Sequence, residues 1–129
     1  MNRTRHHGVS PFEEKYGFAR AVRVGERIEV AGTAPVPAVG GSLAQGPYAQ
    51  MMRCSEIAIE GLEALGGSPS DVVRTRMFIV DADDADDIGR AHNTLFGACE
   101  PASTMVVVAG LLGPSWLVEI EVEAIVGEH

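Results

Sequence analysis

The stretch Pro-Ala-Ser-Thr-Met-Val-Val-Val-Ala-Gly-Leu-Leu-Gly-Pro-Ser-Trp-Leu-Val-Glu-Ile-Glu-Val-Glu-Ala-Ile-Val, residues 101–126, decides the fold. Its β-branched runs predict two strands joined by a turn that contains glycine and proline. The second strand carries Glu119, Glu121 and Glu123 at alternate positions, and the two-residue period of a strand places all three on one face. Like charges side by side on an apolar strand are unfavourable unless cations or water meet them, so this row is a candidate functional feature.

The rest of the chain supplies the partners of these strands. Residues 17–24 and 27–31 predict a hairpin around a Gly-Glu turn, and residues 72–80 predict a further strand. A helix is expected from Pro47 to about Leu65, because apolar residues recur every three or four positions: Met51, Cys54, Ala58, Leu62 and Leu65. A second helix is expected over residues 83–96, with its acidic residues near its positive end. This order predicts an α+β fold with a mixed sheet and two helices on one face.

Alternation in the strand 72–80 assigns its side chains to two faces. One face is expected to carry Val73, Thr75, Met77 and Ile79, and the other Val72, Arg74, Arg76, Phe78 and Val80. In the second helix we expect His92 to be a packed, hydrogen-bonded residue at the edge of the apolar stripe. The acidic run of residues 81–87 does not have the glycine and glutamate positions of an EF-hand calcium loop, so no metal site is predicted there.

Length and composition set the protein class. We expect residues 1–129 to form one domain, with residues 1–11 as an irregular tail. The net charge of −8, from 18 acidic and 10 basic residues, disfavours nucleic-acid binding. Cys54 and Cys99 are expected to be free thiols in a cytoplasmic protein, and no apolar run is long enough to span a membrane. No nucleotide-binding motif is present, so no cofactor is expected.

The sheet face that the two helices do not cover is expected to be apolar in part. It carries Val22, Val106 and Val108 in this prediction. Large apolar faces that a monomer leaves in water usually mark subunit contacts, so we expect a closed oligomer.

Several short motifs, in their order and spacing, resemble the Rid family, also called the RidA or YjgF family. They are Val-Ala-Gly-Thr-Ala-Pro at 30–35, the strand Asp-Val-Val-Arg-Thr-Arg-Met-Phe-Ile-Val-Asp at 71–81, Pro-Ala at 101–102 and Leu-Val-Glu-Ile-Glu at 117–121. The resemblance covers essentially the whole chain. It implies a chorismate-mutase-like α+β fold and a homotrimer in which the sheets form a central barrel, with small-molecule pockets between subunits.

The resemblance also implies an activity and a set of positions for it. Characterised members hydrolyse reactive imines and enamines without a cofactor, and an arginine after Pro-Ala grips the substrate carboxylate through a bidentate pair. This chain has Ser103 at that position, and a neutral serine supplies a weaker hydrogen bond than arginine. The resemblance also implies a glutamate that is associated with activation of water. Glu119 matches this position best, and Glu121 is the alternative. The substrate-binding positions implied by the resemblance are Phe18, Ala31, Gly32, Ser103 and Met105.

Two interpretations of the glutamate row follow. In one, Glu119 lines an intersubunit cleft in which partial burial raises its pKa towards the range of a general acid or base. In the other, the glutamates pair with Arg74 and Arg76. We expect a mixture, with Glu119 in the cleft and at least one other glutamate paired. Arg76 is a candidate for the missing cation and, alternatively, a structural partner.

The sequence thus predicts a Rid-like trimer that binds a small carboxylate- or carbonyl-bearing metabolite. The protein is also a candidate imine or enamine deaminase, which is a hydrolase. Ser103, in place of the expected arginine, leaves this activity open. The alternatives are a metabolite-binding trimer without activity and, less favoured because of the acidic charge, an endoribonuclease.

Overall fold

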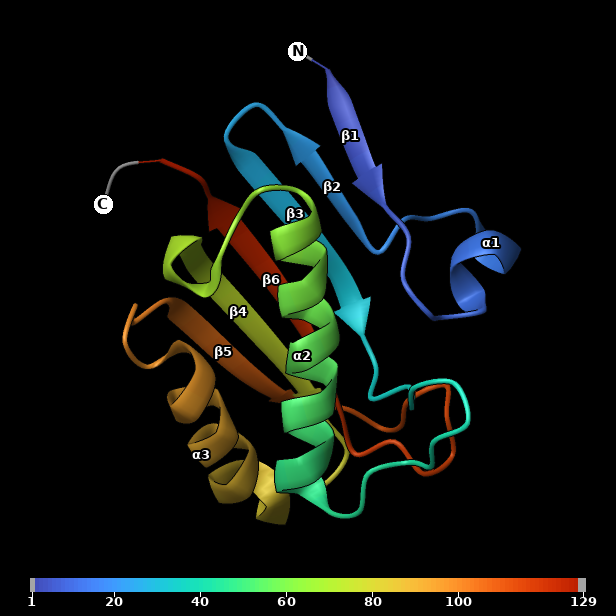
Figure 1. Cartoon of the computed structure of the whole chain (residues 1–129). Coiled ribbons are helices and arrows are strands. Elements are labelled where there is room, and N and C mark those ends of the chain that lie inside the picture. Colours follow the sequence, from blue (N-terminus) through green and yellow to red (C-terminus); the bar gives the residue numbers. More distant parts are fainter. Residues whose placement is uncertain (1, 128–129) are drawn as a thin grey trace.

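A six-stranded mixed sheet forms the centre of the computed structural model, which describes residues 2–127 (Figure 1). The strand order is β1-β2-β3-β6-β4-β5, and only the β4–β5 pair is parallel. The strands are β1 (Arg3–His6), β2 (Ala21–Val24), β3 (Arg27–Thr33), β4 (Val72–Ile79), β5 (Ala102–Val107) and β6 (Val118–Ile125). The helices are α1 (Phe12–Tyr16), α2 (Pro47–Ala64) and α3 (Ala85–Phe96), with short 3-10 turns at Pro69–Asp71 and Ala82–Asp84.

The helices α2 and α3 lie on the same face of the sheet, which confirms the predicted α+β architecture (Figure 1). The stripe predicted for α2 is buried, since Met51, Cys54, Ala58 and Leu62 are fully inaccessible to solvent. The helix begins with Pro47 in its first turn, where the missing N–H of proline removes no helical hydrogen bond. It ends before Gly66, whose φ of 88° suits a residue without a side chain. Neither α2 nor any other helix in residues 2–127 is long and apolar enough to cross a membrane.

The strand β6 confirms the two-residue period predicted for residues 118–125. Its helix-facing side chains are Val118, Ile120, Val122 and Ala124, all fully buried. The three glutamates project from the opposite, open face. Because β6 pairs with both β3 and β4, the apolar residues of β6 occupy the middle of the core and its glutamates occupy the middle of the open face.

The strand β4 corrects one detail of the predicted pattern. Thr75, Met77 and Ile79 share one face as expected, and this face is buried. Val72 is 3% exposed and Val73 is 41% exposed, the reverse of the expected grouping. The register of β4 against β6 shifts between Val72 and Arg74. This irregularity inserts one residue and reverses the alternation before it.

The N-terminal segment was predicted wrongly as an irregular tail. Arg3–His6 forms the edge strand β1, which pairs antiparallel with β2, and Phe12–Tyr16 forms α1. The side chains of β1 are exposed or half-buried, so hydrogen bonds of the backbone hold β1 to β2. The sequence of β1 therefore has no alternating apolar pattern that would predict a strand. The strand expected from residue 17 starts only at Ala21, because residues 17–20 lead out of α1.

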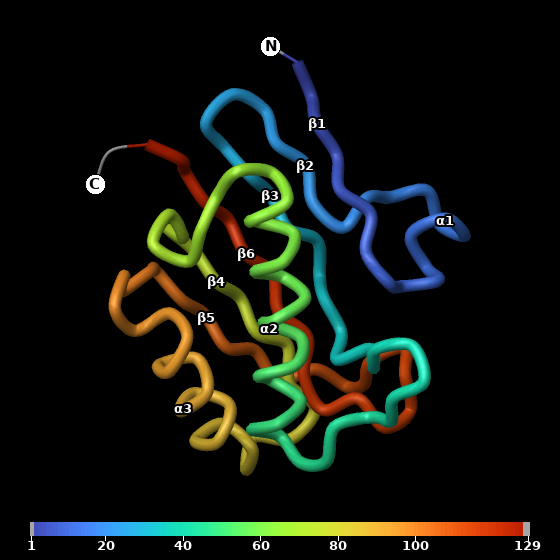
Figure 2. The backbone as a smooth tube through the Cα atoms, viewed as in Figure 1, coloured from blue at the N-terminus to red at the C-terminus, as the bar shows by residue number. Residues whose placement is uncertain are grey.

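Two segments that are distant in the sequence lie at one end of the sheet. The loop that follows β3 runs beside the loop that leads into β6 (Figure 2). The side chain of Gln50, in the first turn of α2, ties this end together, because its amide donates to the carbonyl of Ser115 at 3.1 Å and accepts from the N–H of Leu117 at 2.7 Å. This arrangement fixes the entry of β6 into the sheet.

Candidate functional site

Glu119 lies at the start of β6 and lines a cavity of about 90 Å³. The other lining residues come from α1 and its flanks, from the end of β3 and from the loop before β6: Ser10, Phe12, Tyr16, Phe18, Arg20, Gly32, Ala34, Leu112 and Trp116. The cavity therefore brings the predicted residues Glu119, Phe18 and Gly32 together.

The pKa of Glu119 is raised. Burial of the carboxylate is the main cause, the charge of Glu121 adds to it, and the charge of Arg20 opposes it. A carboxyl group whose pKa moves towards neutrality is better suited to exchange protons with a substrate or a water molecule. The local environment thus gives Glu119 the properties of a candidate acid or base.

Gly32 lies where the pairing of β3 with β6 shifts register between Val30 and Thr33. A Cβ atom at position 32 would lie 3.4 Å from Oε1 of Glu119. The absence of a side chain keeps the approach to this carboxylate open on the β3 side. Irregular pairing of this kind often occurs beside functional sites, because it redirects backbone groups out of the regular ladder.

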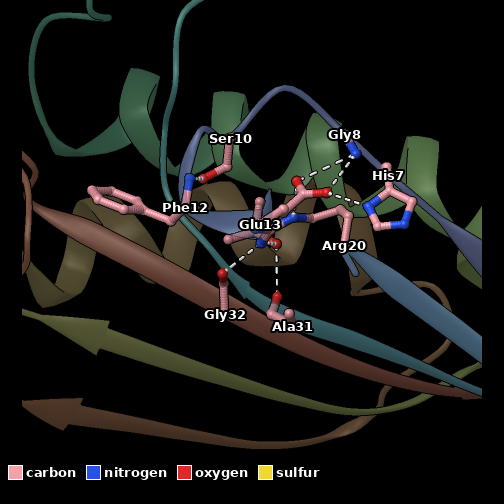
Figure 3. Close-up of polar contacts among 9 residues, drawn as sticks. His7, Gly8, Ser10, Phe12, Glu13, Arg20, Ala31 and Gly32 are labelled. Atoms are coloured by element: carbon pink, nitrogen blue, oxygen red, sulfur yellow. Dashed lines mark hydrogen bonds and ion pairs between the residues drawn. The ribbon is translucent and has the colours of Figure 1, made fainter. Parts of the chain in front are cut away.

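Arg20 is the central residue of a buried polar network beside this cavity (Figure 3). Its side chain is almost fully buried and lies with Nε 3.3 Å from Oε2 of Glu13. Its Nη1 donates to the carbonyl oxygen of Gly32 at 2.6 Å and to Oγ1 of Thr33 at 2.9 Å. The ring of Phe18 has its centroid 5.4 Å from Cζ of Arg20. Arg20 thereby joins the segment before β2 to the end of β3.

Glu13 holds the other side of this network. Its carboxylate accepts from the N–H of Gly8, at 3.0 Å to Oε1, and lies 3.3 Å from Nδ1 of His7 (Figure 3). The pairing between Glu13 and Arg20 was not predicted from the sequence. It depends on α1, which folds residue 13 back onto residue 20, and α1 was not predicted.

Arg76 lies elsewhere on the open face. Its Nη1 donates to Oε1 of Glu123 at 3.2 Å and lies 3.5 Å from Oε1 of Glu121. With Ala31 and both glutamates it lines a separate cavity of about 380 Å³. The expectation that at least one glutamate besides Glu119 pairs with an arginine is confirmed. Within the chain, Arg76 and Ala31 do not line the cavity of Glu119.

Ser103 and Met105 belong to the helix-facing side of β5, which lies at the edge of the sheet opposite β1. The hydroxyl of Thr75 donates to Oγ of Ser103 at 2.8 Å and lies 2.7 Å from Nε2 of His92. Burial lowers the pKa of His92, whose ring also packs on Phe96 with centroids 5.2 Å apart. His92 is thus the packed, hydrogen-bonded histidine that the sequence predicts. Neither Ser103 nor Met105 lines the cavity of Glu119 within the chain.

Both cysteines are free thiols, as expected. Cys54 is buried in α2, and burial raises the pKa of its thiol to about 12. A thiol with so high a pKa is almost entirely protonated at neutral pH and is a poor nucleophile.

The family model described as Endoribonuclease L-PSP matches residues 10–126. The chain belongs to the Rid family. The Rid protein described here is 41% identical over 118 residues to an uncharacterized protein of Streptomyces coelicolor, covering 89% of this chain and 86% of that relative. It is 32% identical over 109 residues to a RutC family protein of Pyrococcus abyssi, covering 84% of each.

A crystal structure shows the same fold. A member of the YjgF/YER057c/UK114 family from Mycobacterium tuberculosis superposes with a TM-score of 0.87 at 36% identity, covering 97% of this chain and 100% of that chain. Family membership supports a small-molecule-binding role for this Rid protein. In this chain, Ser103 occupies the position at which the resemblance led us to expect an arginine. The cation whose charge acts on the pKa of Glu119 is Arg20.

Proposed function

We propose that this Rid protein binds a small imine- or carbonyl-bearing metabolite and hydrolyses the imine, with Glu119 as general acid and base. The observation that carries the proposal is the half-buried carboxyl group of Glu119, with a raised pKa, in a cavity that Gly32 keeps open. General acid–base catalysis by one positioned side chain typically contributes about 10²- to 10⁴-fold in rate.

The reaction requires one water molecule and one proton shuttle. The Glu119 carboxylate takes a proton from water as the water oxygen bonds to the imine carbon. The resulting carboxylic acid then gives this proton to the imine nitrogen, which forms a carbinolamine. The Glu119 carboxylate next takes the hydroxyl proton of the carbinolamine and delivers it to the nitrogen, so that the C–N bond breaks, the C=O bond forms and ammonia leaves. Because the proton returns from the same group, Glu119 ends each cycle as it began.

We further propose that the working unit is a homotrimer in which the three sheets form a central barrel. The cavity of about 90 Å³ has room for about three water molecules at roughly 30 Å³ each, which is small for a substrate together with its attacking water. The open face also leaves Val106 40% exposed and Phe78 half-buried in a single chain. A neighbouring subunit at this face would cover these side chains and enlarge the pocket. We place this trimer in the cytoplasm, where Cys54 and Cys99 would remain reduced.

A metabolite-binding trimer without activity is the second candidate. The observation that favours it is the neutral Ser103 at the position where the resemblance implies a carboxylate-binding arginine. An endoribonuclease is a third candidate, since the matching family model carries that description. The net charge of −8 weakens this third candidate, because affinity for RNA depends largely on neutralising phosphates.

The test is a competition assay with semicarbazide. A solution in which 2-iminopropionate is generated continuously is treated with semicarbazide, and the adduct is measured with and without the protein. We expect the wild type to reduce the adduct, Glu119→Gln to lose at least about 100-fold of this activity, and Glu123→Gln to retain it. Glu123 is the matched control because it projects from the same face of β6 but pairs with Arg76.

The outcomes separate the candidates. Full activity in Glu119→Gln would exclude Glu119 as the acid. A wild type that leaves the adduct unchanged would favour the binding protein without activity.

A further inference from the structure

A groove of about 630 Å³, here called the helix groove, runs along α2 and reaches α3 on the helical side of the sheet. The two helices pack side by side there (Figure 1). Its apolar lining includes Tyr48, Met52, Ile59 and Leu95, all of them only half-buried. Among the described residues, none lines both this groove and the cavity of Glu119. The groove lies on the side opposite the open sheet face, so the trimer proposed above would leave it accessible.

Three glutamates of α2 form the acidic wall of the helix groove. Glu56, Glu60 and Glu63 are exposed and recur every three or four residues, so they lie along one side of the helix. The first of them pairs with Arg53, whose Nη1 lies 2.6 Å from its Oε1. Within residues 2–127, Glu60 and Glu63 make no ion pair and no side-chain hydrogen bond. The groove thus offers two carboxylates that this part of the chain leaves unpaired.

These two carboxylates are unfavourable for α2 itself. Like charges about one helical turn apart repel one another, and the C-terminal end of a helix carries the negative end of its dipole. Glu63 lies in the last turn of α2, which contains no basic residue. A cation bound at this end would relieve the repulsion and complement the dipole. The acidic wall is therefore complementary to a basic partner.

The arginines near the other end of the helix groove are already engaged. Arg53 donates from Nε to the carbonyl oxygen of Val36 at 2.8 Å, in addition to its ion pair. Arg90 donates to Asp87 at 2.8 Å, and its Cζ lies 4.6 Å from the centroid of the Tyr48 ring. The charge that remains available to a partner is thus negative.

The walls of the helix groove also favour one shape of partner. They are helices, whose backbone hydrogen bonds are made internally, so an extended strand would find few backbone partners there. A helix needs no such partners and presents apolar side chains every three or four residues. Methionine and aromatic side chains, such as Met52 and Tyr48, are common in surfaces of this kind.

We propose that the helix groove docks a basic amphipathic helix of a partner protein. The apolar side chains of that helix occupy the floor formed by Met52, Ile59 and Leu95, and its lysines or arginines pair with Glu60 and Glu63. A second copy of this chain is a poorer occupant, because its net charge of −8 would be repelled by the acidic wall. This docking role is independent of the proposed hydrolysis.

The test uses two model peptides of about 18 residues, long enough to form a helix. Both place leucines every three or four positions, and the remaining positions are lysine in one peptide and glutamate in the other. Binding is measured by fluorescence anisotropy at physiological salt concentration on the wild type and on the double variant Glu60→Gln with Glu63→Gln. The matched control is the double variant Glu14→Gln with Glu26→Gln, which removes the same charge from exposed glutamates outside the groove.

We expect the lysine peptide to bind the wild type at least about tenfold more tightly than the glutamate peptide. The Glu60→Gln with Glu63→Gln variant should weaken binding of the lysine peptide at least about tenfold, and the control less than about twofold. Both changed residues are exposed, so we expect this variant to fold. Its thermal midpoint should rise, because repulsion along α2 is reduced.

A second measurement locates the bound peptide. With isotope-labelled methionine methyl groups, the NMR signal of Met52 should shift when the lysine peptide is added. Met105 is the internal control, because it is also half-buried but lies in β5, outside the helix groove, and its signal should stay in place.

Three results would overturn the inference. They are a lysine peptide that does not bind the wild type, equal weakening in the two double variants, and a shift of Met105 without a shift of Met52. The oligomeric state is followed by sedimentation without peptide. A smaller assembly in the Glu60→Gln with Glu63→Gln variant would assign the groove to a second copy of this chain and would also overturn the inference.

Discussion

The Nη1 atom of Arg20 donates a 2.6 Å hydrogen bond to the carbonyl oxygen of Gly32, and this bond connects the N-terminal segment to the strand end beside Glu119. Arg20 precedes β2 and Gly32 lies near the end of β3, so the bond crosses between neighbouring strands beyond the regular hairpin pairing. The position of the backbone at Gly32 thus depends on a buried ion pair that lies outside the row of glutamates.

The buried pair of Glu13 and Arg20 predicts a large loss of stability when one partner is neutralised. Both side chains are about 4% exposed, and breaking a buried pair typically lowers the free energy of unfolding by about 3 to 5 kcal/mol. We expect a loss of this size in Glu13→Gln, measured by urea unfolding at equal protein concentration. The control Glu14→Gln changes an exposed glutamate of the same helix and should stay within about 0.5 kcal/mol of the wild type. Equal unfolding midpoints for the two variants would contradict the structural role of the pair.

Glu119 predicts a pH-dependent difference in stability. Because its pKa is raised on folding, the folded state binds the proton more tightly than the unfolded state, and stability falls as the pH rises above about 4.5, the ordinary pKa of a glutamate side chain. Glu119→Gln removes this unfavourable ionisation. The variant should therefore gain free energy of unfolding relative to the wild type as the pH is raised from 4 to 8, with no gain below pH 4. A relative gain towards low pH would show that the sign of the pKa shift is wrong.

Thr75 predicts a cost for removing a buried hydroxyl. This fully buried residue contacts Nε2 of His92 and donates to Ser103. Thr75→Val keeps the shape but leaves the imidazole nitrogen without its partner, so we expect a loss of about 1 to 3 kcal/mol in thermal or urea unfolding. Thr4→Val, at an exposed position of β1, is the matched control and should stay within about 0.5 kcal/mol. If Thr75→Val lost no more stability than the control, the contact between Thr75 and His92 would contribute nothing to the free energy of unfolding.

The acidic balance predicts weak binding to RNA. With a net charge of −8, the protein should show no tight complex with single-stranded RNA at physiological ionic strength, as measured by fluorescence anisotropy. Lowering the salt concentration is expected to produce little increase in affinity, because few phosphates are neutralised. Tight and strongly salt-dependent binding would revive the endoribonuclease candidate.

The central elements were predictable from the sequence because their periods match their burial. The alternation of β6 and the three-to-four spacing of α2 each describe one apolar face, and both faces are buried as expected. The edge strand β1 has no such pattern, because its contacts to β2 run through the backbone. Periodicity indicates where a segment is buried and gives little information on a strand held only by its edge.

The candidate site was predictable only in part, for a related reason. Glu119, Phe18 and Gly32 were expected together, and they line one cavity. Arg20 was missed because its partners, Glu13 and the carbonyl of Gly32, are brought to it by a short helix and by a shift in strand register. Every residue has a backbone carbonyl, so a hydrogen bond to one cannot be predicted from the identity of the residue. The placement of Ser103 also depends on a tertiary contact, its hydrogen bond to Thr75.

The strand order has a consequence for how the molecule is assembled. The last described strand in the chain, β6, occupies the centre of the sheet, with β3 on one side and β4 on the other. Without β6, the sheet separates into the β1-β2-β3 and β4-β5 groups, which share no strand-to-strand hydrogen bonds. The catalytic candidate Glu119 is part of this same joining strand. Completion of the sheet and arrival of the acid in its cavity are therefore one event, so a partly folded chain that lacks the central pairing also lacks the site.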